Sequence, residues 1–206
     1  MLRLILQFMY YYKRLTLILF ICLTLSFLLP ITTFTIIRDA DQMLKTRAQT
    51  VPLIIGRKGS PLQLVLHSLY YKSYLPGELT YQTYHDVKND NTCTIIPINN
   101  KFSANNIPVV GTTLSYFTQK KYSVKEGYFF QVLGEAIVGI NAAKALQVAI
   151  GDHIITDVGS LYNISGMYPL ELKIAGILDK TGSPDDEVIF VDIKTTWVIQ
   201  GIGHGH

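Results

Sequence analysis

Three consecutive acidic residues, Asp185, Asp186 and Glu187, form a cluster whose carboxylates could attract a cation. They belong to a turn that begins at Thr181 and contains glycine and proline. Acidic residues in such turns are usually solvated, because they form local hydrogen bonds with the backbone and face water. We therefore interpret the cluster as a solvated turn and not as a metal site.

Histidine is the other residue type that could supply metal ligands or a general base. His204 and His206 would face the same way on an extended segment, but a structural zinc needs four ligands and the sequence nominates no others. We interpret this end as a solvated tail. His67 lies on an apolar segment and is interpreted as a flank residue with a local hydrogen bond. His85 and His153 have no partner that the sequence identifies.

The sequence lacks the motifs of several common enzyme classes. It contains no G-x-x-x-x-G-K-[ST], so an ATP-driven process would need a partner subunit to bind the nucleotide. The motifs G-x-S-x-G and H-E-x-x-H are also absent. We therefore name no catalytic, cofactor-binding or metal-binding residue, expect no cofactor, and expect that the chain is not an enzyme.

Composition and charge point away from nucleic acid. The 206 residues are 49% hydrophobic and 16% charged, which is more apolar than an average soluble domain. The net charge of +3 comes from Arg3, Lys13 and Arg14, because the remaining 15 Lys and Arg balance the 15 Asp and Glu. A neutral main body offers no basic surface to a phosphate backbone. Cys22 lies in an apolar segment and Cys93 far beyond it, so we expect no disulfide between them.

The apolar segment spans residues 15–37, which are uncharged and include fifteen Leu, Ile or Phe. As a helix these residues would extend about 34 Å, enough to cross a hydrocarbon core of about 30 Å. A cleaved signal peptide is the competing interpretation. We favour a transmembrane helix, since the apolar run is longer than a signal peptide's and no A-x-A-like cleavage site follows it.

The basic residues set the expected orientation. Because they precede the span, the positive-inside rule places the N-terminus in the cytoplasm and residues 38–206 on the outer side of the membrane. Residues 1–14 combine apolar positions at helical spacing with Tyr10, Tyr11 and Tyr12, which favours an interfacial segment. A plain extension of the span fits the same periodicity.

Residues 38–206 contain more expected strands than helices. Residues 39–49 are polar and free of proline, which favours a helical stalk that continues the span. The clearest helix has Ser60 as N-cap and Pro61 in the first turn. Short turns join most strands, so we expect an α+β domain with one or two antiparallel or mixed sheets. Expected strands are 51–55, 94–97, 107–112, 135–140, 153–156, 170–178 and 188–191, and expected helices are 61–69, 81–88, 141–146 and the segment from Asp192 toward Trp197.

Six blocks of this outer part resemble a known family. The blocks are PLIIGRKGSPLQLVLHSLYY (52–71), IIPINN (95–100), VVGTTLSYF (109–117), EGYFF (126–130), EAIVGINAAKALQVAIGDHI (135–154) and ELKIAGILDKTGSPDDEVIFV (171–191). Together with the basic start and first membrane helix of residues 1–37, they resemble ABC transporter permeases of the MacB/FtsX type. The resemblance implies an extracytoplasmic domain made of a mixed α/β lobe and a small β-rich lobe.

The resemblance also implies function and partners. Such permeases lie in the bacterial inner membrane as homodimers in contact with its lipid. They couple a cytoplasmic ABC ATPase to conformational work outside the membrane, and residues 39–49 would be the stalk. Members of the family have further membrane helices after the outer domain, so we expect the sequence to be the N-terminal part of a truncated, split or fragmentary permease. The alternative is a stand-alone, single-pass anchored module that binds a peptide, lipid or envelope partner.

Overall fold

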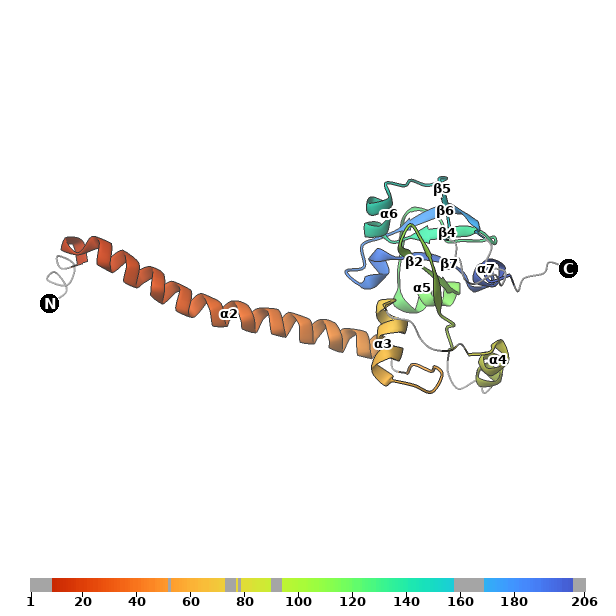
Figure 1. Ribbon diagram of the computed structural model, residues 1–206, viewed down its shortest axis with the longest axis horizontal. Helices are drawn as coiled ribbons and strands as arrows, with labels where there is room; N and C mark the ends of the chain where they lie inside the picture. Colours follow the sequence, from red (N-terminus) through yellow and green to blue (C-terminus); the bar gives the residue numbers. More distant parts are fainter. Residues whose placement is uncertain are drawn as a thin grey trace. The chain divides into compact units, whose positions relative to one another are not determined.

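The computed structural model describes residues 9–51, 53–72, 77, 79–89, 94–157 and 169–201. The chain divides into two compact units, Met1–Leu53 and Ile54–His206 (Figure 1). Cys93, His204 and His206 lie outside the described residues, as does the beginning of the expected interfacial segment.

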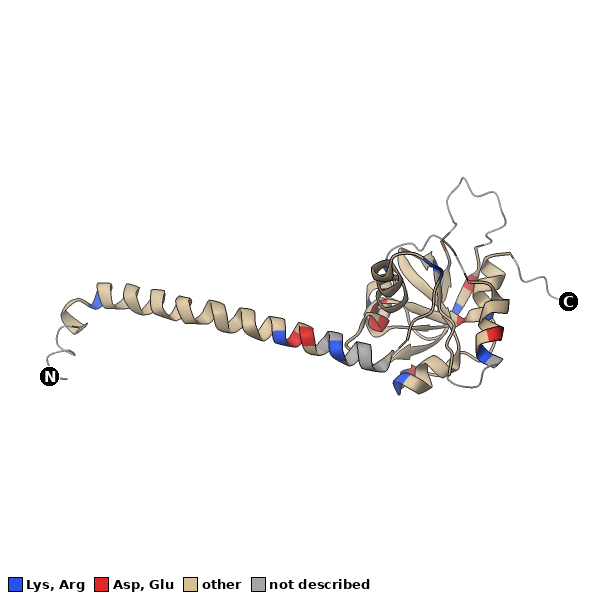
Figure 2. Ribbon diagram, turned by 90° about the horizontal axis from the view of Figure 1, so that it is seen from below, with Lys and Arg blue, Asp and Glu red and all other residues tan. Residues whose placement is uncertain are grey.

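The first unit contains one long helix, α2, which runs over Lys13–Thr50 and includes Pro30 without ending there. Its stretch Lys13–Gln42 is long and apolar enough to cross a membrane. Figure 2 shows charged residues toward both ends of α2 and an uncharged stretch between them. The helix continues through residues 39–49, as expected for a stalk. The boundaries after residues 14 and 37 depend on the position of a membrane and stay a prediction.

The second unit begins with two helices. α3 spans Pro61–Tyr70 and begins as expected, with Ser60 extended and Pro61 in the first turn, although the Ser60 side chain makes no capping bond. α4 spans Tyr81–Asn89, and its first turn is capped by the Thr80 hydroxyl, which accepts a bond of 3.3 Å from the Thr83 amide.

Among the described residues, seven strands form one mixed sheet in the order β1-β2-β7-β4-β6-β3, with β5 also paired to β6. The pairs β2 with β7 and β4 with β6 are parallel, and the others are antiparallel. The strands are β1 Asn99–Ala104, β2 Ile107–Thr112, β3 Val124–Gly127, β4 Glu135–Val138, β5 His153–Ile155, β6 Glu171–Leu178 and β7 Ile189–Asp192. The described helices and strands confirm the expected fold class, an α+β domain after an N-terminal apolar helix.

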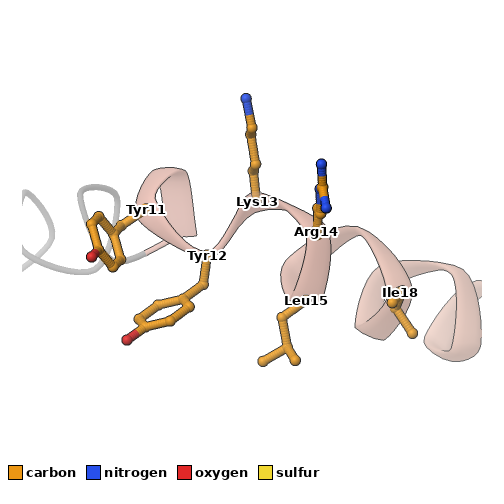
Figure 3. A pocket seen from close by; sticks show the side chains of 6 residues that line it. All are labelled: Tyr11, Tyr12, Lys13, Arg14, Leu15 and Ile18. Carbon is orange, nitrogen blue, oxygen red and sulfur yellow. The ribbon is translucent and has the colours of Figure 1, made fainter.

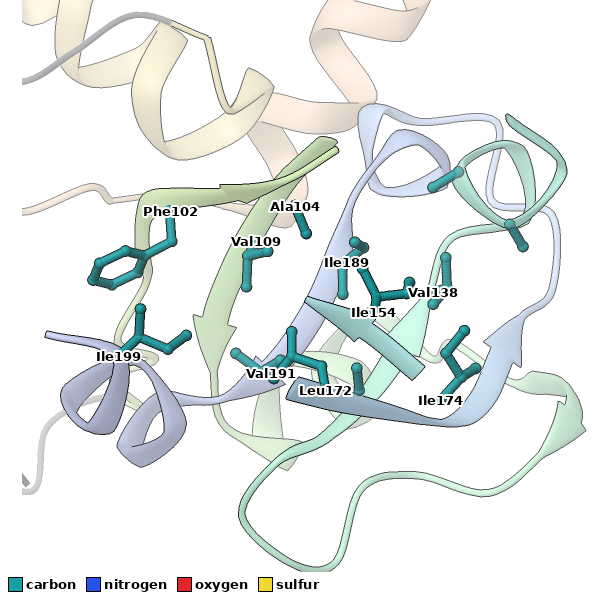
Figure 4. Close-up of a cluster of buried hydrophobic side chains, with 13 residues drawn as sticks. Phe102, Ala104, Val109, Val138, Ile154, Leu172, Ile174, Ile189, Val191 and Ile199 are labelled. Atoms are coloured by element: carbon teal, nitrogen blue, oxygen red, sulfur yellow. The ribbon is translucent and has the colours of Figure 1, made fainter. Parts of the chain in front are cut away.

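Both faces of the sheet are buried. Successive residues of a strand point to opposite faces, and Val109 and Val110 accordingly belong to two different hydrophobic clusters, as do Ile189 and Phe190. Figure 4 shows the first cluster, in which side chains of β2, β4, β6 and β7 converge. The second cluster is richer in aromatic residues. The short elements that complete the unit are α5 Leu114–Lys120, α6 Ile140–Leu146, the 3₁₀ helix η1 Pro184–Glu187 and α7 Ile193–Ile199.

Two expected strands are irregular instead. Residues 94–98 form no ladder, although Ile96 and Ile98 still pack against the second cluster. Pro97 lacks the amide that a ladder needs. The described residues of 51–55 are also outside any sheet, and Leu53 and Ile55 are exposed.

Candidate functional site

The acidic turn is where the structure departs most from the sequence interpretation. Asp185 and Asp186 are buried, with exposed fractions of 1% and 2%, so the interpretation of a wholly solvated turn was wrong. They lie in η1, whose backbone packs so closely against Gly139 that a Cβ there would come within 2.4 Å of the Asp185 carbonyl oxygen. A glycine at the start of α6 therefore makes room for the buried turn.

Four side chains converge on the carboxylate of Asp185. Oδ1 accepts hydrogen bonds from the hydroxyls of Tyr71 (2.7 Å) and Tyr116 (3.0 Å). Oδ2 accepts from the Tyr122 hydroxyl (2.6 Å) and from Lys120 Nζ (2.9 Å). We call these five residues the Asp185 cluster. They come from the end of α3, from α5 and the residue two positions after it, and from η1, so the cluster connects elements that lie far apart in the sequence.

The electrostatics of the cluster favour an ionised carboxylate among neutral phenols. Burial by itself would raise the pKa of Asp185, but the Lys120 ammonium and the hydroxyl donors lower that pKa, and the balance lies below the ordinary value. Burial, reinforced by the Asp185 charge, raises the pKa of Tyr71, Tyr116 and Tyr122. Each carboxylate oxygen already has two donors. The cluster is thus suited to holding α3, α5 and η1 together.

Asp186 closes its own turn. Oδ1 accepts from the amide and hydroxyl of Thr181, both at 2.8 Å, and Oδ2 accepts from the Gly182 amide at 2.9 Å. The oxygens that might have bound a cation are therefore engaged. Within the described ranges, no group of three or more His, Cys, Asp or Glu could hold a metal ion.

The described histidines lie on α3, α4 and β5. On α3, the carbonyl of His67 accepts a bond of 2.8 Å from Asn100 Nδ2 in β1. His153 Nδ1 lies 3.0 Å from Glu171 Oε1 on the exposed side of β5 and β6, a partner that the sequence did not identify. The His85 ring contacts the Tyr81 ring at a centroid distance of 6.1 Å.

A second buried carboxylate shapes a loop before β4. Glu135 accepts hydrogen bonds from the Tyr128 hydroxyl and the Gln131 amide, both at 2.8 Å, and from the Val132 amide at 3.3 Å. Val132 and Leu133 are nevertheless 61% and 56% exposed. The hydrogen bonds to Glu135 thus order a loop that presents two adjacent apolar side chains to solvent. The sequence did not predict this exposed pair, because the pair depends on the Glu135 carboxylate that orders the loop.

A shallow hollow lies beside the start of α2 (Figure 3). It has a volume of about 370 Å³, and the Tyr11 and Tyr12 rings meet edge to face at a centroid distance of 4.9 Å. Tyrosine and basic residues beside an apolar span are typical of the headgroup region of a membrane. The lining residues are Tyr11, Tyr12, Lys13, Arg14, Leu15 and Ile18.

Comparison with known proteins gave thirteen similar chains of solved structures, two of which illustrate the similarity. No family model and no curated protein sequence matches the chain. The extracellular domain of the noncanonic ABC-type transporter YknZ from Gram-positive bacteria has a TM-score of 0.46 and 15% identity, over 68% of this chain and 71% of that one. The periplasmic region of MacB from Actinobacillus actinomycetemcomitans has a TM-score of 0.41 and 12% identity, over 56% of each chain. Both of these structures are extracytoplasmic: one is an extracellular domain and the other a periplasmic region.

Proposed function

We propose that the chain supplies the first membrane helix and the extracytoplasmic domain of an ABC transporter permease of the MacB/FtsX type. The observation that carries the proposal is α2, a single helix of 38 residues that is apolar over residues 15–37 and polar after them. The six sequence blocks and the mixed α/β domain that follows α2 support it.

The exposed apolar surface of α2 needs to be shielded from water. The fifteen large apolar side chains of residues 15–37 are 48–68% exposed. Water is a poor solvent for so large an apolar surface, since each Å² left exposed costs about 25 cal/mol. A bilayer is the cover that fits both the length and the composition.

Because α2 is helical from the apolar span through residues 38–50, it could transmit motion from the membrane to the outer domain. Beyond the span, residues 38–50 would extend the helix by about 20 Å. Along this part, Asp41 and Lys45 form an i,i+4 ion pair at 2.6 Å, which favours the helical conformation. A helical stalk transmits rotation or displacement better than a flexible linker. In the proposed permease, a cytoplasmic ATPase would move the span of each subunit of a homodimer, and the stalk would carry that motion outward.

Membrane insertion and orientation test the proposal. Each variant carries one cysteine in a background with Cys22→Ser and Cys93→Ser, and intact cells are treated with a membrane-impermeant maleimide. We expect labelling of K125C, which replaces an exposed residue of β3, and labelling of K13C only after the cells are opened. Both proteins should stay in the membrane fraction after a high-salt wash. Release by salt, or the opposite labelling pattern, would contradict the proposal.

The second candidate function is a stand-alone anchored module that binds a partner outside the membrane. The observation that favours it is the Glu135-ordered loop with its exposed Val132 and Leu133. Replacing both apolar residues by serine should abolish cross-linking to an envelope partner under this alternative. The matched control is Glu126→Gln, an exposed change on β3. Unchanged cross-linking would remove the observation that favours the alternative.

A further inference from the structure

Tyr71 has a special position in the second unit. Among the residues from 9 to 101 whose exposure the structure describes, it alone is buried. It follows α3 directly as its C-cap, and its backbone is left-handed with φ of 55°. The described residues of α3 itself include none that are buried. Tyr71, the residue after the last turn of α3, is therefore the buried residue through which this helix contacts the sheet.

The side chain of Tyr71 ends in the Asp185 cluster. Its hydroxyl lies 2.7 Å from Asp185 Oδ1 and 2.7 Å from the Tyr116 hydroxyl, and its ring meets Phe190 of β7 edge to face at 6.3 Å. A second tie between α3 and the sheet is the bond from Asn100 Nδ2 to the His67 carbonyl. Asn100 Oδ1 is buried without a hydrogen-bond partner, so that tie is incompletely satisfied.

Release of Tyr71 would leave the rest of the cluster intact. Asp185 would keep Tyr116, Tyr122 and Lys120 as donors, so its charge would not become buried and unpaired. An unpaired buried charge is the main cost of breaking such networks. The second hydrophobic cluster would lose one aromatic ring and keep its other members, which come from α5, β2, β4, β6 and β7 and from the segments beside them.

We propose that Tyr71 is a releasable latch, which holds α3 on the sheet domain through Asp185 and lets α3 detach while the sheet stays folded. The role of the latch rests on the proposed function: motion of the stalk would be relayed to the outer domain at α3, the first helix after α2. Detachment itself is a property of this chain and needs no ATPase.

Hydrogen exchange of the full chain in detergent micelles, read by mass spectrometry, tests the latch. The variant Tyr71→Phe keeps the ring and removes both hydroxyl contacts. The control Tyr122→Phe removes a bond to the same carboxylate from a residue outside α3. We expect the amides of α3 to exchange about tenfold faster in Y71F, since a bond to a charged group is lost. The amides of β2 and β7 should be unchanged, and Y122F should leave α3 within about twofold of the wild type.

Three results would overturn the latch: no change of α3 in Y71F, an equal loss of protection in β2 and β7, or the same acceleration of α3 in Y122F. The third would show that any weakening of the cluster frees the helix, so that Tyr71 has no special role. The exchange assay contains no transport partner. Its failure would leave the membrane orientation result standing, whereas reversed labelling of K13C and K125C would refute the proposed function and leave the latch intact.

Discussion

Replacing Asp185 by asparagine removes the charge on which the donors of the cluster converge. The amide is the same size as the carboxylate, but its NH₂ group would face donors where Oδ2 accepted them. Lys120, whose side chain is 18% exposed, would lose a counter-ion at 2.9 Å. Removing one partner of a buried ion pair costs about 3–5 kcal/mol. We expect about 3 kcal/mol, because Lys120 keeps some contact with solvent.

Thermal unfolding of the full chain in detergent measures this loss. For a domain of about 150 residues, about 3 kcal/mol corresponds to a fall in Tm of roughly 6–12 °C. Trp197, the single tryptophan, lies on α7 beside the Tyr81 ring and provides a fluorescence signal from the second unit. The matched control is Asp179→Asn, which changes an exposed carboxylate with one bond of 3.1 Å from Ser123 and should leave the Tm nearly unchanged.

The pH dependence gives a second check on the same variant. Although burial opposes ionisation, Lys120 and the hydroxyl donors hold the pKa of Asp185 below its ordinary value. A group with a lowered folded pKa stabilises the protein above its unfolded pKa, about 3.9 for aspartate, and that stability is lost as pH falls through the folded pKa. The difference between wild type and D185N should therefore be constant near neutral pH and shrink below about pH 4. A Tm within about 1 °C of the wild type at neutral pH, or a difference that persists in strong acid, would refute the reasoning.

Three further changes have defined outcomes. Gly139→Ala places a Cβ against the backbone of η1, and we expect a loss of at least about 2 kcal/mol in the same melt; a variant as stable as the wild type would show that the turn can shift freely. Asp192→Ala removes the N-cap of α7, which accepts from the Lys194 amide at 2.8 Å, and should cost about 1 kcal/mol; no change in Tm would contradict the capping role. Leu25→Arg, within the apolar part of α2, raises the free energy of membrane insertion by about 3 kcal/mol. It should reduce the amount of membrane-integrated protein in a fractionation assay, and undiminished integration would argue against a span at that position.

Local patterns predicted the elements whose signals are complete within a few residues. β2 occupies residues 107–112, as the sequence predicted, and α3 begins at Pro61 after an extended Ser60. Asp192 caps the last helix as expected. The caps, turns and apolar runs of these elements lie within or next to the elements themselves. The local sequence is therefore sufficient to predict them.

Elements that depend on distant partners were missed. β1 contains Asn99, Asn100 and Lys101, which have weak strand preference, and it forms because it pairs with β2 across the turn at Asn105 and Asn106. Both turn residues have positive φ, 50° and 63°, as tight hairpin turns require. The seven-residue helix α5 was also not predicted, and its N-cap Thr113 makes no side-chain capping bond.

The burial of Asp185 could not be predicted from its neighbours. Its partners Tyr71, Tyr116 and Tyr122 lie 114, 69 and 63 residues away in the sequence. A glycine- and proline-containing turn with three acids is usually solvated. In this fold it is covered by tyrosines from two other parts of the chain, and the same tyrosines had no assigned role in the sequence.

If this chain works as part of an ATP-driven transporter, as we propose, its native partners include an ABC ATPase, and isolation of those partners tests the proposal. The native protein would be extracted from membranes in mild detergent with an antibody against the outer domain, and the co-purified proteins identified and assayed for ATP hydrolysis. We predict an ABC ATPase in stoichiometric amount and ATP hydrolysis in the eluate, with neither recovered when the antibody is blocked by excess outer-domain antigen. Recovery of the membrane-bound chain with no ATPase would contradict the account and favour the anchored binding module.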